Sequence, residues 1–303
     1  MVGARLRGGV CDVRAGWCAV GWRGVSCWFG RGVRVVAEAL LERWGLRVTG
    51  PGMRGMTAVV LPVERADGTA AALKVLTPDE ETVGEPLALR AWGGRGSVRL
   101  LEWDPPTGAL LLERLDEKRP LSGLARRDAR VAVGVIGELL ARLCAVPAPE
   151  GLRGLGAIAA GMLERVPGAA AGLASAADRR VLRDCAGALA EVAGEPGDRL
   201  LHWDLHFGNV LAGEREPWLA IDPKPLAGDP GFELLPSLVN EYRERDVRWR
   251  FDLLTEAVGA DRERARAWTL GRVLQNCLWE VEEGCRRLPR REVAVAGLLL
   301  GRR

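Results

Sequence analysis

The sequence has no long apolar run and contains little of several residue types that mark special classes of protein. No stretch approaches the roughly 18 uninterrupted apolar residues of a membrane-spanning helix, so no membrane partner is expected. The seven cysteines include no Cys-x-x-Cys pair, which disfavours a zinc finger and favours reduced thiols in the cytoplasm. Only three lysines occur, and the net charge is +3 with both signs interspersed. Without a basic stripe and interleaved aromatic residues, no nucleic-acid partner is expected.

Residues 1–36 differ from the rest of the chain. They combine three of the seven cysteines with glycine and arginine, and they sustain no helical or strand period. We interpret them as an N-terminal extension that is either poorly ordered or a misassigned translation start. An amphipathic helix is predicted over 37–47, where the folded part begins. A chain that starts near Val35 is therefore expected to fold and to work fully.

The remaining sequence changes character near residue 116. Its apolar fraction of 48% is ample for a buried core. Apolar runs separated by turn residues predict a mostly antiparallel sheet with one helix, as strands at 57–65, 70–76, 98–103 and 109–115 and a helix at 83–92. Helical structure takes over from residue 126: it is predicted over 128–145, throughout the Gly- and Ala-rich stretch 151–193, and again after 234. We divide the chain into a sheet-rich lobe, 37–115, and a helix-rich lobe, 116–303, which is an α+β organisation.

One polar segment, His-Trp-Asp-Leu-His-Phe-Gly-Asn at 202–209, carries the predicted chemistry. Phosphoryl transfer needs a carboxylate that orients the attacking hydroxyl and oxygen ligands that hold Mg²⁺ against the phosphates. Asp204 supplies the carboxylate, and Asn209, five residues later, supplies one oxygen ligand. Asp222 follows a short predicted hairpin and supplies the second, which is enough for a cation that keeps several waters. We predict Asp204 as the catalytic base and Asn209 and Asp222 as metal ligands.

The two histidines of the chain also invite a zinc-hydrolase interpretation. A helical His-Glu-x-x-His pattern places both zinc ligands on one face of a helix. Here Trp203 follows His202, so the acid is misplaced, and no third histidine exists. We interpret His202 and His206 as structural residues that brace the loop.

The sheet-rich lobe contains candidates for binding the nucleotide. Lys74 lies on an apolar strand and Glu85 opens the following helix, a pattern in which the carboxylate orients the lysine against the α- and β-phosphates. A lysine that merely extends to the surface is the alternative. Glu113 and Leu115 end the lobe, where a hinge would pair backbone groups with adenine, although an ordinary strand end has the same pattern.

The spacing His202-x-Asp204-x₄-Asn209, followed by Ile-Asp at 221–222, resembles the aminoglycoside phosphotransferases, which are relatives of protein kinases. Segments at 109–115, 201–206, 216–233 and 267–279 are similar to the streptomycin 6-kinase and hydroxyurea phosphotransferase branch of that family. The resemblance covers about 37–290. It implies a protein-kinase-like bilobal fold, with a small antiparallel-sheet N-lobe, a larger mostly helical C-lobe, and ATP in the cleft. It leaves the role of Lys224 in Asp-Pro-Lys open.

The expected activity is ATP- and Mg²⁺-dependent transfer of the γ-phosphate to the 6-hydroxyl of streptomycin, by a cytoplasmic monomer or weak dimer. The alternatives are a metabolic kinase for another hydroxylated, amino or guanidino small molecule, and an inactive nucleotide-binding scaffold. The guanidinium groups of streptomycin require carboxylates. The candidates follow the predicted metal-binding Asp222 in the sequence, and the main ones are Glu233, Glu241 and Glu280.

Overall fold

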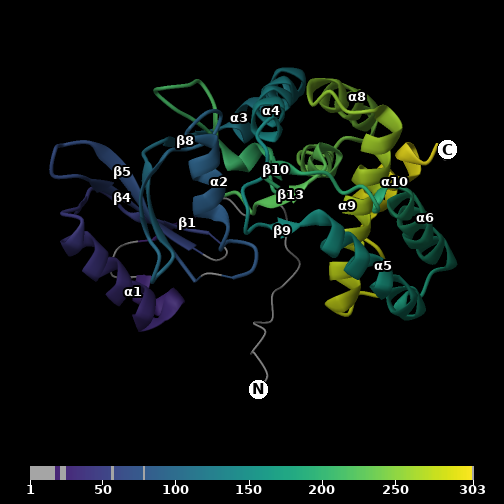
Figure 1. Cartoon of the computed structure of the whole chain (residues 1–303), viewed down its shortest axis with the longest axis horizontal. Helices are drawn as coiled ribbons and strands as arrows, with labels where there is room; N and C mark the ends of the chain where they lie inside the picture. The colour runs from purple at the N-terminus through teal and green to yellow at the C-terminus, as the bar shows by residue number, and fades with distance from the viewer. Residues whose placement is uncertain (1–17, 21–24, 56–57, 78, 302–303) are drawn as a thin grey trace. The chain divides into compact units, whose positions relative to one another are not determined.

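A seven-stranded sheet dominates the N-terminal part of the chain in the computed structural model, which describes residues 18–20, 25–55, 58–77 and 79–301. The strand order is β1-β3-β4-β5-β7-β6, with β2 pairing with β4. Figure 1 shows β4 and β5 side by side in this sheet. The strands are β1 (Cys18–Val20), β2 (Arg47–Val48), β3 (Gly52–Arg54), β4 (Ala58–Glu64), β5 (Ala70–Leu76), β6 (Leu100–Asp104) and β7 (Ala109–Glu113). The predicted hairpin is confirmed, because β4 and β5 pair antiparallel across the turn at Gly68, whose φ is 83°.

Helix α1 (Val25–Arg43) packs on this sheet through Ala37 and Leu40. The helix predicted for 37–47 therefore begins earlier and ends sooner than expected. It ends because Gly45 adopts the left-handed conformation, with φ 61°. The amide of Leu46 then bonds to Leu41 O and that of Gly45 to Glu42 O, the pattern of a glycine C-cap. The N-terminal boundary proposed at residue 36 falls inside α1.

The chain forms two units. Among the described residues, the first comprises those before 78 together with 101–114, and the second comprises 79–100 and 115–301. The change at residue 115 lies next to the predicted lobe boundary. The segment 79–100, which carries the helix expected at 83–92, groups with the second unit rather than with the sheet.

The second unit is mostly helical. Its helices are α2 (Glu85–Trp92), α3 (Leu121–Arg127), α4 (Ala129–Cys144), α5 (Leu155–Gly172), α6 (Ala176–Val192), α7 (Leu235–Val239), α8 (Val247–Ala257), α9 (Arg262–Glu282) and α10 (Arg290–Leu299). Helix α9 packs against α5, α6 and α10, and its central residues, including Trp268 and Leu270, are fully buried. No helix in the part of the chain that the structure describes is long and apolar enough to cross a membrane.

Two small sheets in this unit hold the loops of interest. One has the order β10-β13-β9 and the other β12-β11-β8. Their strands are β8 (Asp116–Pro120), β9 (Arg153–Gly154), β10 (Arg199–Leu201), β11 (Val210–Ala212), β12 (Leu219–Ala220) and β13 (Leu226–Gly228). The loop 202–209 leaves β10 and enters β11, and the segment 221–225 connects β12 to β13. Both loops therefore start and end on the same pair of sheets.

Candidate active site

The loop 202–209 folds back on itself around Asp204. The backbone oxygen of Asp204 accepts hydrogen bonds from His206 N and from Asn209 Nδ2, both at 3.0 Å. Asn209 is buried, and because its nitrogen donates inward, Oδ1 is the side-chain atom that can act as a metal ligand. The Asp204 side chain keeps 28% of its surface exposed, so its carboxylate can reach a bound molecule.

His202 ties this loop to the segment 221–224. Its Nδ1 accepts from Asp204 N at 3.4 Å, and its Nε2 lies 3.0 Å from Ile221 O, which assigns the proton to Nε2. Burial lowers the pKa of His202 to about 4, although the nearby Asp204 and Asp222 oppose the shift, so the ring is neutral at physiological pH. The ring also stacks on Trp92, with centroids 6.1 Å apart. The structural role predicted for His202 is thus visible as bonds to both segments.

The two predicted metal ligands lie at one end of the β11–β12 hairpin. Val210 pairs with Ala220, and Ile221 N donates to Asn209 O at 2.9 Å. Asn209 directly precedes the paired strands and Asp222 follows them. Asp222 is a non-glycine residue with φ 59°, a strained conformation of the kind found at functional sites.

The donor set fits a hard cation. Asp222 offers carboxylate oxygens and Asn209 offers an amide oxygen, and Mg²⁺ prefers few protein oxygens completed by phosphates and water. Both nitrogens of His202 are already engaged with the backbone, so this residue has no lone pair left for zinc. In the described ranges no cluster of three or more His, Cys, Asp and Glu side chains could hold a metal.

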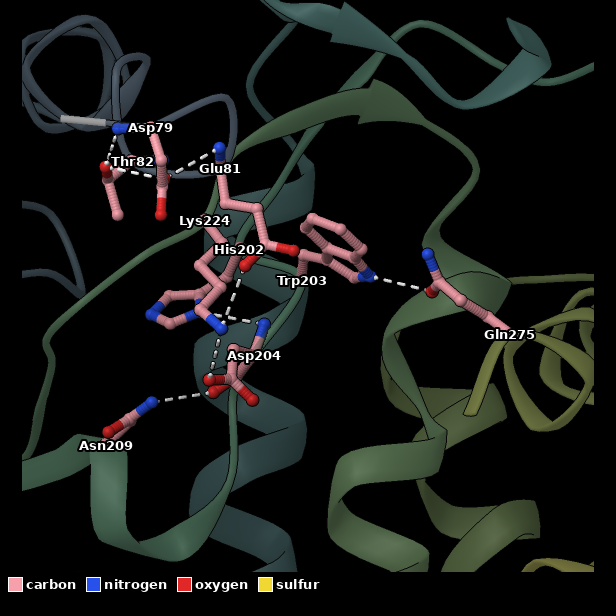
Figure 2. Close-up of polar contacts among 9 residues, drawn as sticks. All are labelled: Asp79, Glu81, Thr82, His202, Trp203, Asp204, Asn209, Lys224 and Gln275. Atoms are coloured by element: carbon pink, nitrogen blue, oxygen red, sulfur yellow. Dashed lines mark hydrogen bonds and ion pairs between the residues drawn. The ribbon is translucent and has the colours of Figure 1, made fainter. Parts of the chain in front are cut away.

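Lys224, in the segment 221–225, lies between the carboxylates of Asp204 and Glu81 (Figure 2). Its Nζ lies 3.1 Å from Glu81 Oε2 and 3.9 Å from Asp204 Oδ2. Burial alone would lower the pKa of Lys224, but the charges of Asp204 and Glu81 outweigh burial and raise it, so the amine is protonated. Neither Glu81 nor this contact was predicted, because Glu81 stands in a turn with no motif and meets Lys224 only through the fold.

A buried layer beneath the loop supports Trp203, which adopts φ 66°. Glu233 is fully buried, and its Oε1 accepts from Trp203 N at 2.5 Å. Burial raises the pKa of Glu233 to about 7, despite that hydrogen bond and the charge of Arg272. The guanidinium of Arg272 lies 5.0 Å from the Trp203 ring centroid, and burial lowers its pKa to about 10. Trp203 Nε1 completes the layer by donating to Gln275 Oε1 at 3.3 Å.

The other predicted residues are distributed over both units. Lys74 is buried on β5 opposite Val60 and Leu110 in the first unit, and Glu113 ends β7 there. Glu85 is buried at the start of α2, and Leu115 is buried at the start of the second segment of the second unit.

The three glutamates predicted to bind streptomycin have different partners in the structure. The carboxylate of Glu233 faces the Trp203 amide inside the protein. Glu241 is exposed and pairs with Arg126 at 3.3 Å. Glu280, near the end of α9, accepts from Cys285 Sγ at 3.3 Å.

An antiparallel-sheet unit, a mostly helical unit and an Asp-x₄-Asn loop beside a second Asp define a protein-kinase-like phosphotransferase. A thermostable mutant of an aminoglycoside phosphotransferase, solved in a ternary complex with ADP and hygromycin B, has the same fold, with a TM-score of 0.59 at 13% identity. The match covers 88% of this chain and 97% of that one. The predicted fold class is confirmed.

The chain belongs to the aminoglycoside/hydroxyurea antibiotic resistance kinase family, whose model matches residues 43–284. It is 77% identical to a hydroxyurea phosphotransferase of Kitasatospora aureofaciens over 88% of this chain and 78% of that protein. It is 56% identical to a streptomycin 6-kinase of Streptomyces glaucescens over 88% of this chain and 89% of that protein. The predicted family is therefore confirmed, and the chain is a phosphotransferase with a hydroxyl group as acceptor.

Proposed function

We propose that this chain transfers the γ-phosphate of ATP to a hydroxyl group of a small molecule in a Mg²⁺-dependent reaction. The observation that carries the proposal is the junction made by His202. This residue binds the loop of Asp204 and Asn209 to the segment of Asp222, so the three predicted residues belong to one braced assembly. The ADP in the structurally similar aminoglycoside phosphotransferase supports a nucleotide as donor.

Each residue has a defined task in this reaction. The Asp204 carboxylate accepts the proton of the acceptor hydroxyl, whose oxygen forms a bond to the γ-phosphorus while the bond to the β–γ bridging oxygen breaks and ADP leaves. Asn209 Oδ1 and the Asp222 carboxylate would hold Mg²⁺, which neutralises phosphate charge when bound. The predicted nucleotide-binding roles of Lys74, Glu85, Glu113 and Leu115 remain part of the proposal.

Hydroxyurea is the first acceptor to test. The relative with 77% identity is a hydroxyurea phosphotransferase, and a small neutral acceptor needs no set of converging carboxylates. The 6-hydroxyl of streptomycin, the acceptor expected from the sequence, is the second candidate and is supported by the streptomycin 6-kinase at 56% identity. Glu241 and Glu280 are the proposed guanidinium contacts in that case, since Glu233 is committed to Trp203.

Some predictions about the setting stay proposals. They are a small-molecule partner, a monomer or weak dimer, and a cytoplasmic location.

Mass spectrometry of reaction products tests the proposal. The purified protein is incubated with MgATP and, in separate reactions, with hydroxyurea, streptomycin and no acceptor. We expect phosphorylated hydroxyurea, dependent on protein and lost when EDTA removes Mg²⁺. Phosphorylated streptomycin alone would move the assignment to the second acceptor. No phosphorylated product from a folded protein, with either acceptor, would contradict both acceptor assignments and leave the metabolic-kinase and scaffold alternatives.

A further inference from the structure

The ammonium of Lys224 lies between the carboxylates of Glu81 and Asp204, beside the loop 202–209. Its Nζ is 3.1 Å from Glu81 Oε2 and 3.9 Å from Asp204 Oδ2. The three side chains keep 37%, 33% and 28% of their surfaces exposed, so the group is open to a bound molecule. Figure 2 shows the Lys224 ammonium beside the Asp204 carboxylate, with Glu81 on its other side.

The backbone around Lys224 is tightly constrained. The residue stands between Pro223 and Pro225, both buried, and its amide donates to His202 O at 3.0 Å. Pro225 also packs against Gly84, where a Cβ would come within 3.0 Å of Pro225 Cγ. These contacts fix the backbone of Lys224 relative to the loop that carries Asp204.

The turn that carries Glu81 is equally fixed. Asp79 Oδ1 accepts from Glu81 N at 3.0 Å and from Thr82 N at 2.9 Å. Thr82 Oγ1 donates to the same oxygen at 2.8 Å. Glu81 therefore serves as a rigid anchor that holds the Lys224 ammonium at its place.

We propose that Lys224 is a further catalytic residue, whose ammonium donates a hydrogen bond to the phosphoryl group while that group passes from ATP to the acceptor. This inference rests on the proposed function. An ammonium has three N–H donors, so Glu81 and Asp204 can each take one and leave the third for a phosphoryl oxygen. A point charge between Asp204 and the phosphoryl group also offsets the repulsion between two anions that must approach each other.

The step balances without any change at Lys224. The acceptor proton goes to the Asp204 carboxylate, the acceptor oxygen bonds to phosphorus, and the electron pair of the broken bond leaves with ADP. Lys224 keeps its three protons throughout. Its contribution is charge stabilisation that grows in the transition state, which predicts a loss in kcat rather than in substrate affinity.

Steady-state kinetics of four variants test the proposal: Lys224→Met, Lys224→Arg, Glu81→Gln and, as a control, Lys118→Met on the exposed part of β8. Lys224→Met should lower kcat about 10²-fold, as loss of one oriented donor to a transition-state charge does. Both KM values should stay within about threefold. Lys224→Arg should recover part of the rate, Glu81→Gln should fall in between, and Lys118→Met should match the wild type.

A binding measurement separates catalysis from packing. Aluminium fluoride with MgADP mimics the phosphoryl group in transfer, so wild type should bind this complex more tightly than MgADP alone. Lys224→Met should lose that gain while binding MgADP normally.

Equal kcat in wild type and a folded Lys224→Met, or an equal loss of affinity for both ligands, would overturn the proposal. If Lys224→Met does not fold, Lys224→Arg and Glu81→Gln decide, and wild-type kcat in Glu81→Gln would overturn it. An inactive wild type would instead refute the proposed function.

Discussion

Glu233 carries a carboxyl group that is fully buried beneath the loop 202–209. One oxygen accepts a hydrogen bond from the Trp203 amide, and the other has no hydrogen-bond partner among the residues that the structure describes. Arg272 supplies opposite charge nearby, yet burial dominates and raises the pKa to about 7 from an ordinary 4.5. The group is thus a positioning residue that holds Trp203 in its left-handed conformation, and it gains or loses its charge close to neutral pH.

Glu233→Gln should change how stability depends on pH. Between pH 5 and 7 the folded protein keeps a proton on Glu233 that the unfolded chain releases, so this group's contribution to stability falls as pH rises and is constant above 7. Glutamine does not titrate, so the variant does not lose stability in this way as pH rises. It should therefore gain stability relative to the wild type as pH rises from 5 to 8, by up to about 3 kcal/mol for a pKa change from 4.5 to about 7. Urea denaturation at several pH values measures the difference.

The exposed Glu283→Gln serves as the matched control and should show no such trend. His202, whose pKa is lowered, shifts wild-type stability in the opposite direction over an overlapping range, since its stability contribution rises with pH up to about 6.5. Only the variant-minus-wild-type difference is therefore diagnostic. A difference that stays constant from pH 5 to 8 would show that Glu233 has an ordinary pKa.

At the residue scale, the hairpin that links the proposed site residues could be predicted, and the contacts that support it could not. Asp204, Asn209 and Asp222 stand at fixed intervals around one hairpin, so a linear pattern contains them. The bond between Trp203 and Glu233 joins residues 30 apart, and Glu81 meets Lys224 from a turn before α2. Such contacts arise from packing, which no local pattern encodes. Glu233 was singled out for its position after the site, but the structure places its carboxylate on the backbone.

At the element scale, the 3₁₀ helix η3 (Pro230–Glu233) and helix α9 hold Glu233 in place. Thr269 Oγ1 donates to Gly231 O at 3.1 Å, and Phe232 packs edge-on against Trp268 with centroids 6.1 Å apart. A Cβ at Gly231 would lie 2.9 Å from Ala265 Cα, a backbone atom that cannot yield easily. The small size of Gly231 therefore allows the close approach of these two elements.

Gly231→Ala should destabilise the protein by about 1–3 kcal/mol, since the added methyl overpacks a tight contact. It should also lower kcat, because η3 carries Glu233. Gly187→Ala is the control, since Gly187 lies inside α6 and an added Cβ would meet no described atom within 4 Å beyond its own helix backbone and chain neighbours. That change should raise stability by about 0.5–1 kcal/mol through helix propensity. Thermal unfolding of both variants checks the signs, and equal effects would contradict the packing argument.

Element types were easier to predict than their ends. The short apolar runs on either side of the Asp67-Gly68 turn and the period-3.6 run of α4 indicate their structures directly. The Gly- and Ala-rich stretch 151–193 was predicted only as generally helical, and it forms two helices separated at Leu173–Ser175, where Ser175 caps α6 by accepting from Asp178 N. Alanine favours a helix on both sides of such a break, so composition does not show where the break falls.

At the scale of the whole molecule, the change from sheet to helices could be predicted from the change in period. The grouping of 79–100 with the helical unit could not. It depends on long-range bonds, such as Trp92 Nε1 to Leu143 O at 3.1 Å and Val98 N to Ala220 O at 2.9 Å. These partners are far apart in the chain and carry no shared motif.

A chain that begins at Val35 should be less stable than the full chain. The truncation removes β1, which pairs antiparallel with β3, and the first half of α1, including Val33, which packs against the sheet core. We therefore expect the melting temperature to fall by roughly 2–6 °C, whereas the sequence alone led us to expect no effect. Calorimetry of the two chains decides between these outcomes. An unchanged melting temperature would show that β1 and the start of α1 add nothing to stability.

The most direct test of the central claim is the rate of phosphoryl transfer by Asp204→Asn. Asparagine keeps the size of the side chain but cannot take the acceptor proton. Transfer from labelled ATP should fall roughly 10²–10⁴-fold, the range for loss of a general base. Affinity for MgATP, measured by calorimetry on the same sample, should stay close to that of the wild type. A variant that binds MgATP normally and keeps a tenth of the wild-type rate would contradict the role given to Asp204 and the mechanism built on it.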